Sequence, residues 1–273
     1  MNVFEYRDPS ISILHCLDEK PCSYAMHTHA FAELYCFLQG KVTYYVEGNS
    51  YALQPGDILL MRPAEAHYID VDPTAVYERL YINFDIRLFD MLERDNTLLR
   101  PYFDRRAGTR NHYSADEICT HYLRGVLQPE GSRATRIANL VLLMERLCHL
   151  FGAASVSADQ PDTLEYRLIR FINHNLDREL STQFLCERFF LSPAQLCRRF
   201  HNATGTSVGR YVTTKRLLLA RQLLLQGQKP LKVCTCCGYK DYATFFRAYK
   251  RYFGHTPKDA SSFSFEEDRA IIC

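Results

Sequence analysis

Two arginines occupy matching places in two similar segments near the end of this 273-residue chain. Arg198 lies two residues before Phe200, and Arg247 lies two residues before Tyr249, 49 positions later. Each arginine falls on the side of an expected helix that faces away from the apolar residues. An exposed arginine on a helix can donate two parallel hydrogen bonds to guanine in the major groove of B-DNA. The chemistry that this pattern predicts is the reading of base edges.

A second set of residues has types and spacing suited to a metal ion. His27, His29 and Glu33 lie close together, and His67 follows later. Two histidines separated by one residue on a strand place both imidazoles on the same face. Imidazole with carboxylate suits iron, manganese, nickel, copper or zinc. The pattern resembles the two motifs of cupin barrels, although the second motif lacks its glycine and is one residue short. It is open to two interpretations: a metal site, which could be catalytic, and an inherited scaffold whose side chains line an effector pocket.

The arginines need helices that begin and end at the right places. Ser192 is a good N-cap, Pro193 fits the first helical position, and Gly205 is a good C-cap. Asp241 offers a cap to the second helix. A shorter apolar helix precedes each of these, over residues 182–190 and just before residue 238. The amphipathic stretch over residues 211–226 lies between the two units and would fix their separation. The sequence therefore predicts two bihelical units that could enter successive turns of the major groove.

Charge is divided unevenly along the chain. Residues 163–262 hold 17 Lys and Arg against 6 Asp and Glu, a net charge of +11. Residues 1–162 hold 15 Lys and Arg against 22 Asp and Glu, a net charge of −7. The tail after residue 262 holds 1 against 3, so the whole chain has a net charge of only +2. A basic half next to an acidic half indicates a polyanionic partner for the basic half alone.

Residues 164–259 resemble the double helix-turn-helix domain of AraC-type transcription regulators. The run VCTCCGYKDYATFFRAYKRYFGHTP is similar to that family's signature, and GTSVGRYVTTKRLLLARQLL is similar to its linker-helix segment. The resemblance puts base-reading positions at Ala194, Cys197 and Arg198 in the first helix, and at Ala243, Thr244 and Arg247 in the second. Together with the outward-facing neighbours, the predicted DNA-binding residues are Ala194, Gln195, Cys197, Arg198, Arg199, Tyr242, Ala243, Thr244, Arg247 and Lys250.

The sequence of the acidic half predicts short strands separated by turns. Strands are expected over residues 34–38, 42–47, 57–61 and 76–84, with turn residues between them, which favours a small barrel or jelly roll. Sensor domains of AraC-type regulators resemble cupins without depending on a metal, so the resemblance favours the effector pocket. Its tyrosines would suit a sugar, because a ligand pocket combines aromatic surface with a few fixed polar groups. The predicted pocket residues are His27, His29, Glu33, Arg62, His67 and Tyr81.

Helices are expected between the two halves, over residues 88–99, 115–127 and 133–151. The last carries one apolar stripe, which could pack on its own barrel or, as in the family, form a dimer interface. Residues 152–162 (GAASVSADQPD) have linker composition. The predicted division is a cupin-like barrel over 1–100, a helical dimerisation segment over 101–152, a linker over 153–162, the DNA-binding domain over 163–262 and a tail over 263–273.

Composition excludes several classes of protein. The N-terminus has no leader pattern, and no apolar run approaches 18 residues, so neither secretion nor membrane spanning is expected. The 11 cysteines are irregularly spaced, which is typical of reduced thiols in a cytoplasmic protein rather than a disulfide framework.

These observations predict a cytoplasmic, homodimeric transcription regulator without a cofactor. A small effector, expected to be sugar-like, would enter the N-terminal barrel and change promoter occupancy or contact with RNA polymerase. A metal-dependent cupin enzyme with an appended nucleic-acid-binding domain is the alternative. A DNA-binding architectural protein without an effector is the third class.

Overall fold

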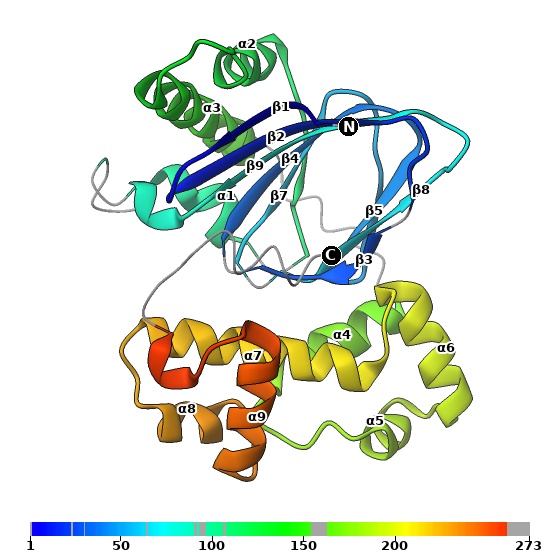
Figure 1. Cartoon of the computed structure of the whole chain (residues 1–273). Helices are drawn as coiled ribbons and strands as arrows, with labels where there is room; N and C mark the ends of the chain where they lie inside the picture. The colour runs from blue at the N-terminus through cyan, green and yellow to red at the C-terminus, as the bar shows by residue number, and fades with distance from the viewer. Residues whose placement is uncertain are drawn as a thin grey trace.

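The computed structural model describes residues 2–22, 24–29, 31–63, 65–89, 92, 97–105, 108–153 and 163–260. An N-terminal domain built on sheets is followed by helices, and a helical C-terminal domain lies below it in Figure 1. This arrangement confirms the predicted α+β fold class, with two helix-turn-helix units at the C-terminal end.

The N-terminal domain contains two antiparallel sheets. One has six strands in the order β1-β2-β9-β4-β7-β10, and the other has four in the order β3-β8-β5-β6. The strand bounds are β1 Asn2–Arg7, β2 Ile11–Asp18, β3 Tyr24–His27, β4 Ala32–Gln39, β5 Val42–Val46, β6 Asn49–Ala52, β7 Asp57–Met61, β8 His67–Val71, β9 Tyr77–Phe84 and β10 His112–Ser114. Within the described ranges no strand pairs with a strand of the other sheet, so the predicted barrel is an open sandwich of two sheets.

Strand β4 shows why the core has two compartments. Its residues alternate between the two faces of the six-stranded sheet, as in any strand. Tyr35 and Phe37 face the four-stranded sheet and pack in the space between the sheets. Leu34 and Cys36 face the other way, into a core shared with helices. Because both faces are covered, β4 is buried along almost its whole length.

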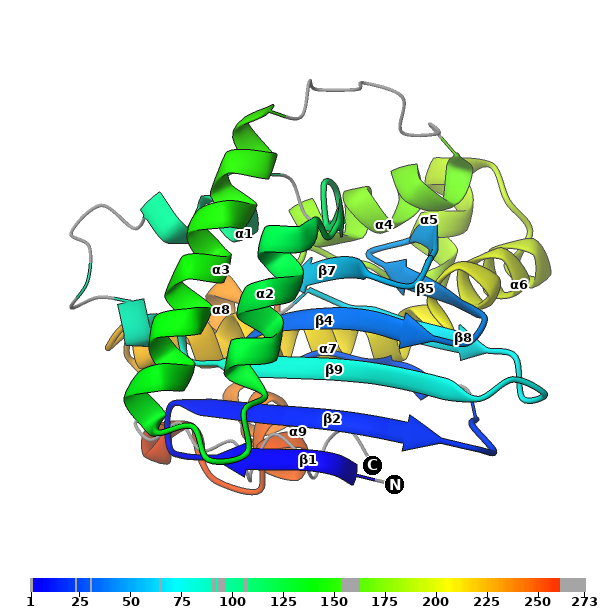
Figure 2. The ribbon, with the colours of Figure 1, turned by 90° about the horizontal axis from the view of Figure 1, so that it is seen from above.

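Two helices cover the outer face of the six-stranded sheet (Figure 2). They are α2 (Glu117–Val126) and α3 (Arg133–Ala153). Leu140, Met144, Leu147 and Phe151 from the predicted apolar stripe are all buried in the core that they share with the sheet. These four residues of the stripe therefore pack on the chain's own sheet.

One prediction for the N-terminal half needs correction, and some of its strands were not predicted. The helix expected over residues 88–99 is wrong: the described residues form two short 3₁₀ helices, η1 (Ile86–Phe89) and η2 (Thr97–Leu99), before α1 (Arg100–Phe103). The apolar side chains of Phe89 and Leu99 reach the core from these separate turns. Strands β1 and β2 precede the first predicted strand, and β10 is too short to give a pattern. The predicted linker, apart from its first residue at the end of α3, and the predicted tail lie outside the described residues.

The C-terminal domain is helical throughout. Its elements are α4 Leu164–His174, α5 Thr182–Phe189, α6 Pro193–Thr204, α7 Val208–Leu225, α8 Pro230–Cys236, α9 Tyr242–Phe253 and η3 Pro257–Asp259. Leu196 and Phe200 of α6 pack in one core with α4, α5 and the start of α7. Phe245 and Tyr249 of α9 pack in a second core with α8 and the end of α7. Helix α7 therefore joins two bihelical units, as predicted.

Caps place the ends of the two outer helices where the sequence indicates. The Ser192 side chain accepts a hydrogen bond from the Gln195 backbone amide, and the Gln195 side chain accepts one from the Ser192 amide, which completes a capping box. Asp241 accepts a hydrogen bond from Thr244 N at 2.7 Å. Gly205 and Gly254 end the helices with φ of 68° and 79°. Among the described residues, no helix is both long and apolar enough to cross a bilayer.

Candidate DNA-reading helices and a buried histidine–glutamate cluster

Helix α6 divides into a buried face and an exposed face. Leu196 and Phe200 are buried at 0% and 1% exposure. The five predicted DNA-binding residues of this helix are all exposed: Ala194, Gln195, Cys197, Arg198 and Arg199. Arg199 forms an ion pair with Glu165 of α4 at 2.8 Å, which leaves Arg198 as the better candidate to contact a base.

Helix α9 has the same division. Ala243, Thr244, Arg247 and Lys250 are exposed, while Phe245 lies in the core. The predicted DNA-binding residue Tyr242 is different, because it is half-buried and packs against Phe245 with ring centroids 5.8 Å apart. Its ring therefore supports the start of α9. The structure places nine of the ten predicted residues on exposed surface, five from α6 and four from α9.

Helix α7 fixes the separation of the two reading helices. Near its start, the ring of Tyr211 packs against Phe200 of α6 with centroids 5.3 Å apart. Near its end, the Arg221 guanidinium lies 5.1 Å from the Phe253 ring of α9. Because a continuous helix is stiff over this distance, α6 and α9 keep one relative placement, which recognition of two groove segments requires. Figure 1 shows α6 and α9 at different places along α7.

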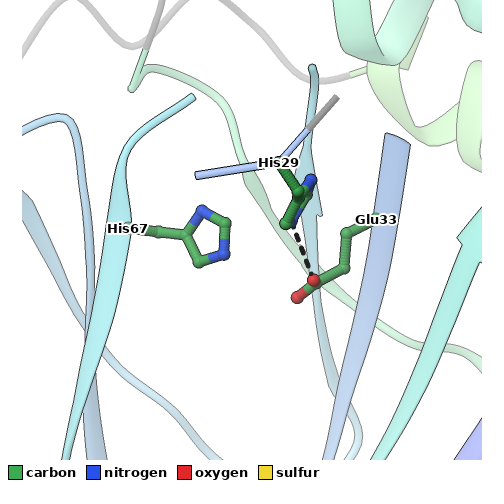
Figure 3. Close-up of side chains that lie close together, drawn as sticks. All are labelled: His29, Glu33 and His67. Carbon is green, nitrogen blue, oxygen red and sulfur yellow. Dashed lines mark hydrogen bonds and ion pairs between the residues drawn. The ribbon is translucent and has the colours of Figure 1, made fainter. Parts of the chain in front are cut away.

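The histidine–glutamate cluster is a buried group of three ligand-type side chains in the N-terminal domain (Figure 3). His29, Glu33 and His67 are between 1% and 4% exposed, and their nearest ligand atoms all lie within 4.8 Å of one another. His27 is not one of the three, although its ring packs edge-on to that of His67 with centroids 4.3 Å apart. The structure therefore brings together three of the four residues that the sequence proposes as metal ligands.

Hydrogen bonds to backbone carbonyls fix both imidazoles. His29 Nδ1 lies 2.9 Å from Phe31 O, and His67 Nδ1 lies 2.8 Å from Glu65 O. A carbonyl oxygen only accepts, so each Nδ1 carries a proton. His67 Nε2 then holds a lone pair that has no hydrogen-bond partner. Burial, together with the neighbouring His27 and His29, lowers the pKa of His67 well below its ordinary value, which keeps this ring neutral.

The same reasoning applies to the contact between His29 and Glu33. His29 Nε2 lies 3.0 Å from Glu33 Oε2, with the proton of the ring already on Nδ1. Either a second proton or a metal cation must therefore lie between this nitrogen and the carboxylate. A divalent transition ion would also satisfy His67 Nε2. Its ligands would be about 3.4 Å apart at bond lengths near 2.1 Å, so the three side chains need only small rotations to bind it. The donor set and its orphaned nitrogen fit such an ion.

Cobalt(II) titration tests this fit. The purified protein should bind about one Co²⁺ per chain and develop visible absorption bands from imidazole and carboxylate ligands. Replacing His67 with alanine should weaken Co²⁺ binding by more than the roughly 10–100-fold that outer-sphere changes cost. His174→Ala, an exposed histidine on α4, is the matched control and should bind as the unchanged protein does. Equal affinity in all three proteins would mean that a proton, and not a metal, joins His29 to Glu33.

The other two predicted pocket residues lie in different surroundings. The Arg62 amide donates to Glu65 at 3.0 Å and its guanidinium lies 3.9 Å from the same carboxylate, so it belongs to a separate polar network. Tyr81 lies on the inner face of the six-stranded sheet, but its hydroxyl accepts a hydrogen bond from Arg79 Nε at 3.0 Å. The inner tyrosines Tyr35 and Tyr77 are also paired, with their hydroxyls 3.0 Å apart. Much of the expected pocket is thus filled by the protein's own side chains.

Sequence reasoning missed a fully buried carboxylate in this domain that accepts several hydrogen bonds. Both oxygens of Glu65 are paired with the two terminal nitrogens of Arg105, at 2.7 and 2.8 Å. Gly108 N donates to the same carboxylate at 2.7 Å and Asn111 Nδ2 at 3.1 Å. Glu65 lies only two residues before His67, so this network holds the segment that carries the cluster. No local pattern could have found it, because 40 residues separate the two charges.

The chain joins two bihelical units, each with an exposed candidate DNA-reading surface, to a sheet domain with a buried polar cluster. This combination defines a DNA-binding regulator with a ligand-binding domain. Comparison with protein families agrees on both halves. Residues 22–151 match the AraC-like ligand binding domain, and residues 185–261 match a helix-turn-helix domain. The chain therefore belongs to the AraC-type transcription regulators.

Individual relatives resemble the chain over most of its length. It is 28% identical over 259 residues to the probable transcriptional regulator LumQ of Photobacterium leiognathi, covering 93% of this chain and 96% of that protein. It is 24% identical over 250 residues to the HTH-type transcriptional activator RhaS of Yersinia pseudotuberculosis, covering 86% and 88%. Among solved structures, ToxT from Vibrio cholerae aligns over 92% of this chain and 97% of its own, at 11% identity and a TM-score of 0.41.

Proposed function

We propose that this regulator binds specific promoter sites as a cytoplasmic homodimer and activates transcription in response to a small, sugar-like effector. The observation that carries the proposal is the pair of exposed basic faces on α6 and α9, which are held at one separation by α7. The relatives named as transcriptional activators support activation as the response. The net charge of +11 on residues 163–262 supports DNA as the partner.

The effector is expected in the N-terminal domain, next to the histidine–glutamate cluster. Tyr44 supports a sugar-like ligand, because its ring stacks on His67 with centroids 5.9 Å apart and its hydroxyl donates to Glu33 at 3.4 Å. Aromatic surface next to fixed polar groups is the usual lining of a small-molecule site. The filled interior means that a ligand must displace side chains on entry, and that displacement can supply a signal.

The alternative function, a metal-dependent enzyme, has less support. The three ligand-type residues fit a metal, but they are at most 4% exposed, and a substrate would need a path to them. A buried site of this kind suits a structural or sensing role better than turnover. The regulator is therefore the function that the arrangement supports best.

Selection of genomic DNA fragments followed by footprinting tests the proposal. The protein should protect a defined site at moderate salt, and a double variant, Arg198→Ala with Arg247→Ala, should lose that protection while remaining folded. The control is Arg178→Ala, an exposed arginine in the loop between α4 and α5, which should leave the footprint unchanged. Protection of every fragment alike would indicate an architectural DNA-binding protein instead. A thermal-shift screen of sugars on the same protein then tests the effector class.

A further inference from the structure

The turn between β5 and β6 enters the helical domain and carries a buried glutamate. Glu47 is 4% exposed and adopts a left-handed φ of 49°, which few non-glycine residues do. The next residue, Gly48, is so close to Ile169 of α4 that a β-carbon built on it would overlap the Ile169 side chain. The backbone of this turn therefore packs directly against α4, in the first bihelical unit.

Four donors surround the Glu47 carboxylate. One oxygen accepts from Ala66 N at 2.7 Å and from the Lys215 ammonium at 2.6 Å. The other accepts from the Tyr211 hydroxyl at 2.5 Å and from Asn173 Nδ2 at 2.7 Å. Three of these donors belong to α4 and α7 of the DNA-binding domain. Three of the four hydrogen bonds to the carboxylate therefore cross between the domains.

Other contacts between the two domains lie around Glu47. The Tyr68 hydroxyl donates to Asn202 O of α6 at 2.9 Å, and the Tyr68 ring stacks on Tyr45 with centroids 4.3 Å apart. Met26 and Ala66 add a small apolar contact to the core of the first unit. The side chains of Glu47 and Lys215 are only 2% and 10% exposed, so their ion pair lies inside this interface and not at its rim.

Glu47 is linked to the histidine–glutamate cluster through Ala66, the residue directly before His67. Ala66 donates its amide to the Glu47 carboxylate, and its carbonyl accepts from Glu47 N at 2.8 Å. His67 follows directly and is itself tied to Glu65 O. A ligand that shifts the backbone at His67 would therefore also shift Ala66, which is one of the four donors to Glu47.

We propose that Glu47 is a latch that holds the first DNA-reading unit against the ligand-binding domain, and that its release lets the two domains move independently. This latch deepens the proposed function, because it names the contact through which a ligand near His67 would act on the reading helices. A charged latch suits this task. Its carboxylate and ammonium are readily hydrated once they separate, whereas an apolar interface would resist opening.

Glu47→Gln tests the chemistry of the latch. The variant removes the negative charge that Glu47 presents to the buried Lys215 ammonium, and it turns an amide NH₂ towards groups that also donate. The opening equilibrium should shift towards separated domains by about a hundredfold, so that hydrogen exchange in residues 42–52, 164–174 and 208–215 becomes faster by a similar factor. Small-angle scattering should show a larger radius of gyration. Glu130→Gln, which makes the same charge change at an exposed site, should change neither measurement.

Gly48→Ala tests the same latch without changing any charge. The added methyl group must push Ile169 away, and it also strains a backbone with φ of 86°. Gly56→Ala is the matched control, because Gly56 has a φ of 93° but nothing within 4 Å of the added carbon. Faster exchange across 164–174 in Gly48→Ala alone supports the latch. Equal exchange in both glycine variants, or wild-type exchange in Glu47→Gln, overturns it.

DNA binding by the same proteins separates this proposal from the proposed function. If exchange responds as expected but neither the unchanged protein nor Glu47→Gln protects a specific DNA site, the latch stands and the proposed function fails. If both protect the same site with unaltered exchange, the latch fails and the proposed function stands.

Discussion

Replacing Arg105 with methionine should lower the free energy of unfolding of the N-terminal domain by about 3–5 kcal/mol. Arg105 and Glu65 form a two-point ion pair, and both side chains are fully buried. Removing the guanidinium leaves the Glu65 carboxylate buried with three neutral donors, which are Gly108 N, Asn111 Nδ2 and the Arg62 amide. The nearest positive charge is then the Arg62 guanidinium at 3.9 Å, too far for a hydrogen bond. A buried charge without its counter-charge is one of the few single defects that costs this much.

Urea unfolding followed by circular dichroism measures the effect. The matched control is Arg100→Met, five residues earlier, which removes an ion pair to Asp104 whose two side chains are each 54% exposed. That exposed pair should contribute less than about 1 kcal/mol. Equal losses in the two variants would show that the buried pair has no special role.

The pH dependence of the loss follows from the pKa of Glu65. Burial alone raises this pKa, but the charge of Arg105 and the hydrogen bonds from Arg105 and Gly108 outweigh burial and hold it below its ordinary value. Glu65 therefore stabilises the fold above its unfolded pKa of about 4.3, and that stability is lost as pH falls through the folded value. In Arg105→Met the two contributions of Arg105 are lost and those of Gly108 and Arg62 remain, so the pKa of Glu65 should rise and the carboxylate should stabilise the fold less. The difference in stability between the two proteins should therefore be largest near neutral pH and narrow below pH ~4.

The sequence predicted the DNA-binding domain well because its signals are local. Ser192, Asp241, Gly205 and Gly254 each fix a helix end within four residues of the chain, and the apolar positions between them repeat at helical spacing. Family models find the same segment. The end of α5 lacks such a signal, because Phe190 adopts a left-handed φ of 55° there, where glycine is the usual choice.

The ligand-binding half was predicted less completely because its decisive contacts join distant residues. Arg62 looked like a pocket residue, but it lies beside Glu65, whose main partner is Arg105. Glu47 occupies an ordinary-looking turn, and its partners Tyr211 and Lys215 lie more than 160 residues away. A pattern along the chain cannot report such pairs. The His29–Glu33 contact was accessible to prediction only because the two residues are four positions apart.

Arg247→Ala should reduce affinity for the specific DNA site by about 1–3 kcal/mol and relax sequence preference at one base pair. Arg247 is exposed on α9, and its guanidinium lies 3.5 Å from the hydroxyl of Thr244, one turn nearer the start of the helix. That contact is too long to hold the side chain strongly, so the guanidinium is free to turn towards a base. Binding to unrelated DNA should change much less, because that binding depends mainly on phosphate contacts.

Lys250→Ala is the matched comparison, because Lys250 lies three residues later, near the C-terminal end of the same exposed face. A lysine at that place is expected to contact phosphate, so its loss should weaken all sequences alike and reduce the salt dependence of binding by about one ion. Measuring affinity for the selected site and for single-base variants of it, at several salt concentrations, distinguishes the two roles. If both variants lose affinity equally on every sequence, neither side chain reads bases and α9 only holds the DNA backbone. Specificity would then have to come from α6, where Arg198 is the exposed arginine at the corresponding place.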